Sequence, residues 1–182
     1  MPEESYWETL FDVPLILSKL GIERFGDVAE LGCGYGTFSI SVARAIRGKL
    51  YTFDIDPAMV ARTLERRAGL PIIAQVRDVM EQGFDATVDA VLLFNILHCK
   101  QPIKLLRYAK DALNDGGEVL VIHWRPDIST PRGPAADIRP DPSQIAEWGL
   151  QAGLASGDVI DLPPWHYGMI LRSNSTSGCR SG

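Results

Sequence analysis

Three glycines at alternate positions follow a short apolar run that ends in an acid. The segment consists of Glu30-Leu31-Gly32-Cys33-Gly34-Tyr35-Gly36, and a helical pattern begins directly after it. This order predicts a strand, a tight turn and a helix. Glycine lets the backbone turn sharply and leaves no side chain between the backbone and a ligand. Because the first N–H groups of the helix point at the turn, the segment predicts a site for a cofactor that carries a nucleoside.

Two further acids follow predicted strands. Asp54 ends the apolar stretch that begins at Leu50, and it lies about 20 residues beyond the glycines, the interval at which a strand-end carboxylate meets a ribose. The next acid, Asp56, precedes Pro57 and is expected to cap a helix. Asp78 follows the short strand predicted over 71–76.

Together these motifs resemble those of the class I S-adenosylmethionine-dependent methyltransferases. The resemblance covers about residues 25–172 and rests on 30–36, 54–57, Asp78 and the late turn Leu113-Asn114-Asp115-Gly116-Gly117. The glycine spacing is G-x-G-x-G, with Thr37 where a dinucleotide-binding site would have its third glycine. The resemblance implies S-adenosylmethionine as cofactor, S-adenosylhomocysteine as product, and methyl transfer to an acceptor.

The resemblance also assigns residues to the cofactor. Glu30 and Gly32 would face the methionyl part, and Asn95 would lie under it. Gly34 and Gly36 would let the cofactor approach the backbone. Asp54 would accept both ribose hydroxyls, Ile55 would pack on adenine, and Asp78 and Val79 would address the adenine edge.

The alternation of predicted strands and helices places these residues on an α/β fold. The run from Val88 to Phe94 is almost entirely apolar, which is typical of a central parallel strand buried on both faces. The resembled fold is a doubly wound, Rossmann-like sheet of seven strands in the order 3-2-1-4-5-7-6. Strand 7 is antiparallel and helices cover both faces. We place strand five over 119–122 and the last two strands over 159–162 and 167–171.

The chain has three histidines, and the resembled topology brings all of them to one rim. His98 follows strand four, His123 ends strand five, and His166 lies where the antiparallel strand begins. A neutral histidine could take a proton from a hydroxyl or nitrogen acceptor. We rank His123 first as catalytic candidate, then His166, then His98. Two alternatives remain: each histidine only bonds a loop backbone, or the three together hold zinc. We predict no metal.

We expect a single methyltransferase domain over residues 1–172. Its N-terminal part, 1–24, would form a helical cap, since helices there often cover the cofactor and acceptor in the resembled family. Five prolines interrupt 126–142, which predicts a loop on the substrate side. The polar stretch 173–182 is expected to be a disordered tail.

Composition limits the partners. The formal net charge of −5 gives no basic footprint for nucleic acid, and no apolar run reaches the roughly 18 residues that span a bilayer. Three cysteines without C-x-x-C spacing suggest neither a disulfide framework nor a zinc site, and with no signal-peptide pattern they favour a cytoplasmic location. A small-molecule acceptor is the more economical expectation, and a homodimer stays open.

The family's signature for methylation of nucleic-acid adenine, Asp or Asn followed by Pro-Pro and an aromatic residue, is absent at 95–98. The first hypothesis is therefore methyl transfer to an oxygen or nitrogen of a small molecule. The alternative is a non-catalytic cofactor- or partner-binding domain on the same fold. A nicotinamide-dependent oxidoreductase is a weaker reading, because the third glycine of that site is missing.

Overall fold

The structure, a computed structural model, describes residues 3–173. Within that range the chain forms one sheet whose strands follow the order β3-β2-β1-β4-β5-β8-β6, with β7 also paired to β8. The strands are β1 (Val28–Leu31), β2 (Leu50–Asp54), β3 (Ile72–Val76), β4 (Val88–Phe94), β5 (Leu113–Trp124), β6 (Leu154–Ser156), β7 (Ile160–Leu162) and β8 (His166–Ser173). The pairs among β1 to β5 are parallel, and β8 is antiparallel to β5. The predicted fold class and strand order are confirmed.

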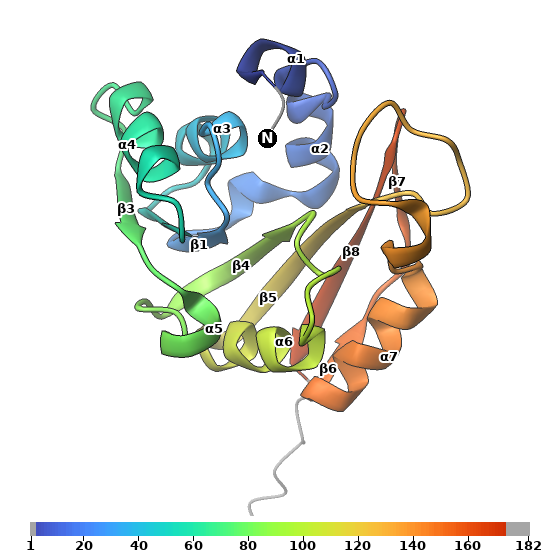
Figure 1. Cartoon of the computed structure of the whole chain (residues 1–182). Helices are drawn as coiled ribbons and strands as arrows, with labels where there is room; N and C mark the ends of the chain where they lie inside the picture. Colours follow the sequence, from blue (N-terminus) through green and yellow to red (C-terminus); the bar gives the residue numbers. More distant parts are fainter. Residues whose placement is uncertain (1–2, 174–182) are drawn as a thin grey trace, which may run out of the picture.

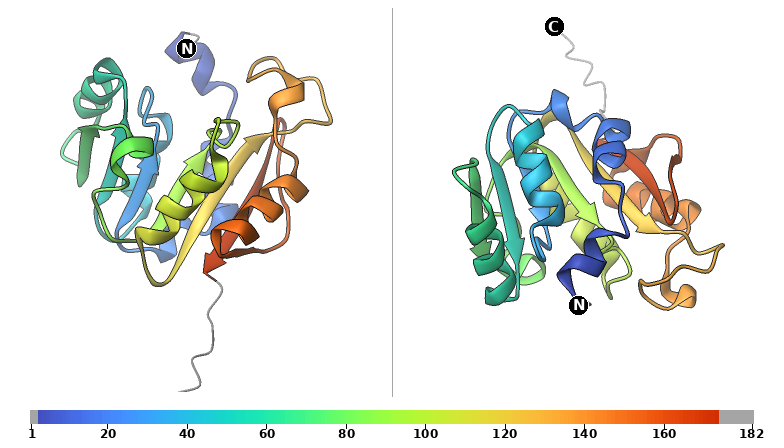
Figure 2. Two further views of the ribbon diagram at one scale, coloured as in Figure 1. Left: turned by 60° about the horizontal axis from the view of Figure 1, so that its bottom comes forward. Right: turned by 90° about the horizontal axis from the view of Figure 1, so that it is seen from above.

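Helices cover both faces of the sheet (Figures 1 and 2). The helical elements are α1 (Glu4–Glu8), α2 (Val13–Leu20), η1 (Ile22–Arg24), α3 (Thr37–Ala45), α4 (Pro57–Arg66), α5 (Val79–Gln82), α6 (Pro102–Asp111), η2 (Ala136–Ile138) and α7 (Pro142–Ala152). One apolar core joins α2, η1 and α3 to the sheet, and a second joins α5, α6 and α7 to the opposite face. No helix in the described range is long and apolar enough to cross a membrane.

Two predicted elements differ from the structure. The segment Asn114–Gly117 was expected to be a turn that separates a helix from strand five, but β5 runs through it from Leu113. The register with β4 shifts between Val88 and Ala90, and Gly116 has φ +79°, so the glycines are accommodated by an irregularity within one long strand.

Two short strands pair with β8 at the edge of the sheet, where a single strand six was predicted. β6, Leu154–Ser156, was not predicted, and the expected strand over 159–162 is β7. Both pair antiparallel with β8, and the Gly157 N–H donates to the Ile170 carbonyl between them. Ser173, expected to begin the tail, is the last residue of β8 and pairs with Leu154. The rest of that tail prediction, 174–182, lies outside the described residues.

The carboxyl ends of the parallel strands gather the elements that form the site (Figure 1). The β1–α3 loop, the β2–α4 loop and the β4–α6 loop all leave this edge. Helix α1 and the proline-rich loop 126–142 lie at the same end, where the guanidinium of Arg132 sits 5.7 Å from the ring centroid of Tyr6. In open α/β sheets this edge is where ligands bind.

Candidate active site

The glycine-rich loop between β1 and α3 adopts the left-handed backbone that its composition predicts. Gly32, Gly34 and Gly36 have φ values of +83°, +51° and +80°. At Gly36 a Cβ atom would also lie 3.2 Å from the hydroxyl of Thr63 on α4, so a side chain would press the loop against that helix. Gly36 is the N-cap of α3 and supplies no side-chain cap, which leaves the first N–H groups of this nine-residue helix directed at the loop.

Asp54 connects the end of β2 to this loop. Its Oδ2 accepts a hydrogen bond from the Gly34 N–H at 3.1 Å, and its Oδ1 accepts one from the Asp56 N–H at 3.0 Å. Asp56 in turn caps α4, as predicted, by accepting from the Ala58 N–H at 2.8 Å. The Cys33 thiol also contacts Oδ2, at an Sγ–Oδ2 distance of 3.8 Å. A carboxylate offers about four lone-pair sites, and a thiol is a weak donor that a hydroxyl can replace. The carboxylate is thus held in one orientation and can still bind two neighbouring hydroxyls, one of them in place of the thiol.

A largely apolar cavity of about 290 Å³ opens beside Asp54. Its walls come from β1 and β2, from the loops that follow β1, β2 and β4, and from α5 and α6. They consist of Leu31, Gly32, Asp54, Ile55, Asp78, Val79, Met80, Ile96, Cys99 and Leu105. The Ile55 side chain is 70% exposed although it is apolar. Asp78 caps α5 by accepting from the Met80 N–H at 2.9 Å, so its carboxyl is fixed at the cavity wall. An exposed isoleucine and a fixed acid on an apolar cavity suit a flat ring with polar edges.

Glu30 points away from the cavity mouth, into the layer between the sheet and α3. It is 2% exposed, and its Oε2 accepts hydrogen bonds from the hydroxyls of Ser39 and Thr52. Burial raises the pKa of Glu30 to about 7, and the negative charge of Asp54 acts in the same direction, while the two hydrogen bonds oppose it. A buried acid with this pKa is poised to respond to a cation placed nearby.

Three buried side-chain polar atoms have no hydrogen-bond partner within the described part of the chain: Thr37 Oγ1, Asn95 Oδ1 and His166 Nε2. Buried polar atoms are rarely left unpaired, so each calls for an explanation. Thr37 is the first residue of α3, next to the glycine loop. Asn95 follows β4 with φ +57°, a conformation that few non-glycine residues adopt. Two unpaired atoms therefore flank the loop at the predicted methionyl end.

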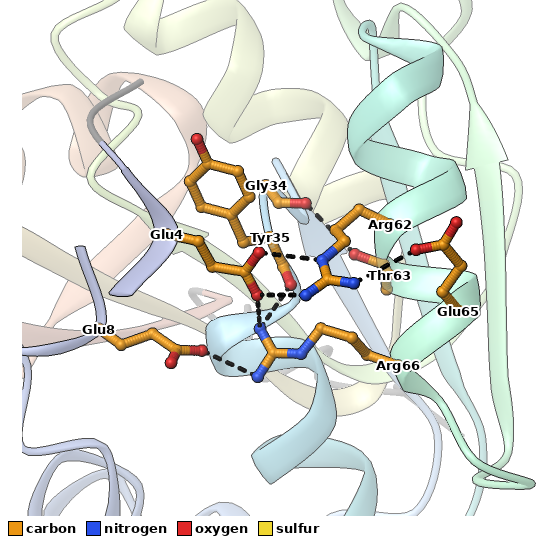
Figure 3. Close-up of polar contacts among 8 residues, drawn as sticks. All are labelled: Glu4, Glu8, Gly34, Tyr35, Arg62, Thr63, Glu65 and Arg66. Atoms are coloured by element: carbon orange, nitrogen blue, oxygen red, sulfur yellow. Dashed lines mark hydrogen bonds and ion pairs between the residues drawn. The ribbon is translucent and has the colours of Figure 1, made fainter. Parts of the chain in front are cut away.

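Helix α1 is held across the glycine loop by ion pairs to α4 (Figure 3). Glu4 bonds Arg62 at 2.9 Å and Arg66 at 2.9 Å, and Glu8 bonds Arg66 at 2.8 Å. Arg66 also donates to the Tyr35 carbonyl at 2.8 Å. The hydrogen bond from Arg62 lowers the pKa of Glu4. No residue of α1 is fully buried, and the helix is attached both by these charged contacts and by the partly buried Trp7, whose ring centroid lies 4.9 Å from that of Phe11.

The three histidines lie at one rim but on two faces of the sheet. His123 and Trp124 are neighbours on β5, and side chains alternate along a strand, so they point to opposite faces. The His123 ring contacts His98, with ring centroids 5.5 Å apart, on the side of α6 and α7. His166 instead packs on Trp124 and Phe11, with centroids at 4.1 and 4.7 Å, on the side of α2.

Burial differs strongly among these histidines. His123 is 0% and His166 1% exposed, whereas His98 is exposed. Burial lowers the pKa of His123 to about 4 and that of His166 to about 3, and it also lowers the pKa of His98. Across residues 3–173 no group of three His, Cys, Asp or Glu side chains is arranged to hold a metal ion. All three rings are neutral at neutral pH, and only His98 can meet a molecule in solution without a rearrangement.

The sequence prediction omitted several residues that the structure brings to this site. Thr37 could have been found from its place directly after Gly36, where a hydroxyl lies at a helix N-terminus. Met80, Ile96, Cys99 and Leu105 line the cavity through the packing of α5 and α6, which no local pattern reveals. Of the predicted cofactor residues, Gly32, Asp54, Ile55, Asp78 and Val79 line the cavity directly.

Comparison with known proteins agrees with this architecture. Residues 28–117 match a family model described as a methyltransferase domain. An S-adenosylmethionine-dependent methyltransferase from Aquifex aeolicus superposes with a TM-score of 0.80 at 20% identity, over 93% of both chains. A Sulfolobus solfataricus protein assigned to the type 11 methyltransferases gives 0.76 at 23% identity, over 95% of this chain and 99% of its own.

A third solved structure is that of magnesium protoporphyrin IX methyltransferase from Synechocystis PCC 6803 with bound S-adenosylhomocysteine. It gives a TM-score of 0.67 at 14% identity, over 88% of this chain and 79% of that one. No curated protein matches the sequence. Residues 28–117 thus match a methyltransferase domain, and the chain has the fold of these solved S-adenosylmethionine-dependent methyltransferases.

Proposed function

We propose that this protein binds S-adenosylmethionine at the carboxyl edge of its sheet and transfers the methyl group to an oxygen or nitrogen of a small molecule. The observation that carries the proposal is the apolar cavity beside Asp54 and Asp78, whose wall includes Gly32 of the glycine loop and Ile96 next to Asn95. Two acids at an apolar cavity suit a nucleoside, and the unpaired Thr37 Oγ1 and Asn95 Oδ1, on segments next to the loop, are available to the amino-acid part.

On the nucleoside side, each residue has a specific part. Asp54 accepts the two ribose hydroxyls with the lone pairs that Gly34 and Asp56 leave free. Ile55 packs its exposed side chain on the adenine face. Asp78 and Val79 address the adenine edge from the start of α5. Gly32 and Gly34 keep the loop free of side chains, so that the backbone can approach the ligand.

On the amino-acid side, charges are distributed to suit a zwitterion. The α3 N-terminus and the Thr37 hydroxyl favour a carboxylate, since a helix N-terminus carries partial positive charge. The ammonium group donates to Asn95 Oδ1. When Glu30 is ionised, it supplies negative charge from the layer between the sheet and α3. Gly36 makes room at the start of the helix.

The bound cofactor supplies an activated methyl group on a sulfonium. The protein orients the acceptor, keeps water out and takes up the acceptor's proton. The three histidines His98, His123 and His166 are the candidates for that proton, because each is neutral at neutral pH.

The test is calorimetric binding of S-adenosylhomocysteine and, separately, of NAD to the wild type, to Asp54→Asn and to the control Asp115→Asn. Asp115 is exposed on β5, away from the cavity. Hydrogen bonds to a charged group contribute about 1.5–3 kcal/mol, so Asp54→Asn should bind S-adenosylhomocysteine roughly 10- to 150-fold more weakly. Equal affinity in both variants would refute the ribose role. Binding of NAD alone would refute the proposed cofactor site.

A further inference from the structure

His98 and His123 form a side-chain pair between the β4–α6 loop and the end of β5. His98 Nδ1 lies 3.4 Å from His123 Nε2, and His123 Nδ1 lies 3.4 Å from the Trp124 carbonyl oxygen. A carbonyl oxygen can only accept a hydrogen bond, and each neutral imidazole carries one N–H and one lone pair. The Trp124 carbonyl therefore places the His123 proton on Nδ1.

The same reasoning extends to His98. With its proton on Nδ1, His123 can only accept at Nε2, so His98 must donate from its own Nδ1. The lone pair of His98 is then on Nε2. His123 is fully buried and stays neutral at neutral pH, with the Tyr167 ring 6.4 Å away and the cationic Arg139 disfavouring a second charge. Arg139 is itself held by three backbone carbonyls, those of Pro134, Arg125 and Arg132.

His98 opens onto a second cleft, of about 430 Å³, between the start of α6 and the η2–α7 segment. Its apolar wall includes Ile103, Ile138 and Trp148, and Ile138 is 51% exposed. Two cations, Lys100 and Arg139, and one acid, Asp137, also line it, so the charged side chains of the cleft leave an excess of one positive charge. Cys99 lines both this cleft and the cavity beside Asp54, so the two sites share a wall.

We propose that His98 is the catalytic base and His123 its positioning residue, and that the acceptor is an apolar-bodied phenol or heteroaromatic N–H compound bound in the cleft beside Ile138 and Trp148. This inference rests on the proposed function. The acceptor's oxygen or nitrogen forms a bond to the methyl carbon, the methyl–sulfur bond breaks, and its electron pair returns to sulfur. The acceptor's proton passes to His98 Nε2, which releases it to solvent after product leaves.

The first test is the histidine tautomer state. The protein is prepared with nitrogen-isotope-labelled histidine and bound to S-adenosylhomocysteine. Its long-range proton–nitrogen NMR spectra should show that His98 and His123 are both protonated on Nδ1. In His123→Phe, which removes the acceptor nitrogen, His98 should shift toward the Nε2–H form. His123→Gln keeps an acceptor oxygen and should restore the original state. A wild-type His98 that carries its proton on Nε2 would overturn the proposal.

The second test is turnover, measured as release of S-adenosylhomocysteine with 1-naphthol, 8-hydroxyquinoline and indole as probes. His98→Gln should lower kcat by about 10²–10⁴-fold, the range for loss of a general base, with KM little changed. His123→Phe should lower kcat less, and His123→Gln should recover part of the loss. Glu147→Gln, on the exposed side of α7, is the matched control and should match the wild type.

The outcomes separate the two proposals. Normal binding of S-adenosylhomocysteine with no turnover of any probe would overturn the acceptor class. Normal binding with a kcat for His98→Gln within threefold of the wild type would overturn the base. If the wild type does not bind S-adenosylhomocysteine at all, the proposed function itself is overturned.

Discussion

Glu30 offers a quantitative test of how the site is built. The carboxyl group is buried beneath the glycine loop, and its neighbours are the hydroxyls of Ser39 and Thr52. Desolvation is the main cause that raises its pKa from 4.5 to about 7. Replacement by glutamine in Glu30→Gln keeps the size and removes the titration. The hydroxyls can rotate to accept from the new amide, so the fold should be retained.

The direction in which pH changes the stability of the wild type follows from proton linkage. Between pH 4.5 and about 7 the folded state holds a proton on Glu30 that the unfolded state has lost. The free energy of unfolding therefore falls as pH rises through this window. A shift of about 2.5 pH units corresponds to roughly 3 kcal/mol at pH 8, where the folded state must keep a buried carboxylate. Glu30→Gln should escape this loss.

The assay is urea unfolding of the wild type and Glu30→Gln at pH 5 and pH 8. Between pH 5 and pH 8 the free energy of unfolding of the variant should rise by roughly 3 kcal/mol relative to that of the wild type. This difference corresponds to about 6–12 °C in Tm for a domain of this size. Glu65→Gln is the control, because the Glu65 side chain is 67% exposed. A constant difference between the variant and wild type at both pH values would refute the reasoning.

Two further predictions concern the other buried charges and contacts. The substitution His166→Phe keeps a ring against Phe11 and Trp124. Because burial lowers the pKa of His166 to about 3, the free energy of unfolding of the wild type falls as pH decreases below 6.5. By pH 4 the variant should have lost about 3 kcal/mol less of this free energy. Parallel unfolding curves from pH 6.5 to pH 4 would contradict this. The substitution Arg66→Gln removes the contacts to Glu4, Glu8 and the Tyr35 carbonyl. Hydrogen–deuterium exchange over residues 4–9 should therefore be faster than in the control Arg67→Gln. The difference in exchange rate should become smaller at high salt, because salt screens ion pairs. Identical exchange in the two variants would show that α1 does not depend on these ion pairs.

Much of the fold could be predicted because it is encoded locally. The apolar run of β4 determines its central place, since only a strand buried on both faces tolerates it. The glycines need left-handed backbone, which the loop indeed has. Asp56 before Pro57 predicted the cap of α4 correctly. By contrast, the Asn-Asp-Gly-Gly segment was predicted as a turn, but pairing with β4 carried the strand through it.

The same distinction between local patterns and distant contacts holds for the candidate site. The sequence by itself determined the strand–loop–helix motif, the strand-end acid Asp54 and the arrival of all three histidines at one edge of the sheet, because these follow from chain order and local backbone geometry. Only the tertiary structure decided that His166 faces α2 while His123 faces His98, which is 25 residues away along the chain. It also decided that Glu4 meets Arg62, 58 residues on. Such contacts depend on how distant elements pack, and packing is a property of the whole chain that no short pattern contains.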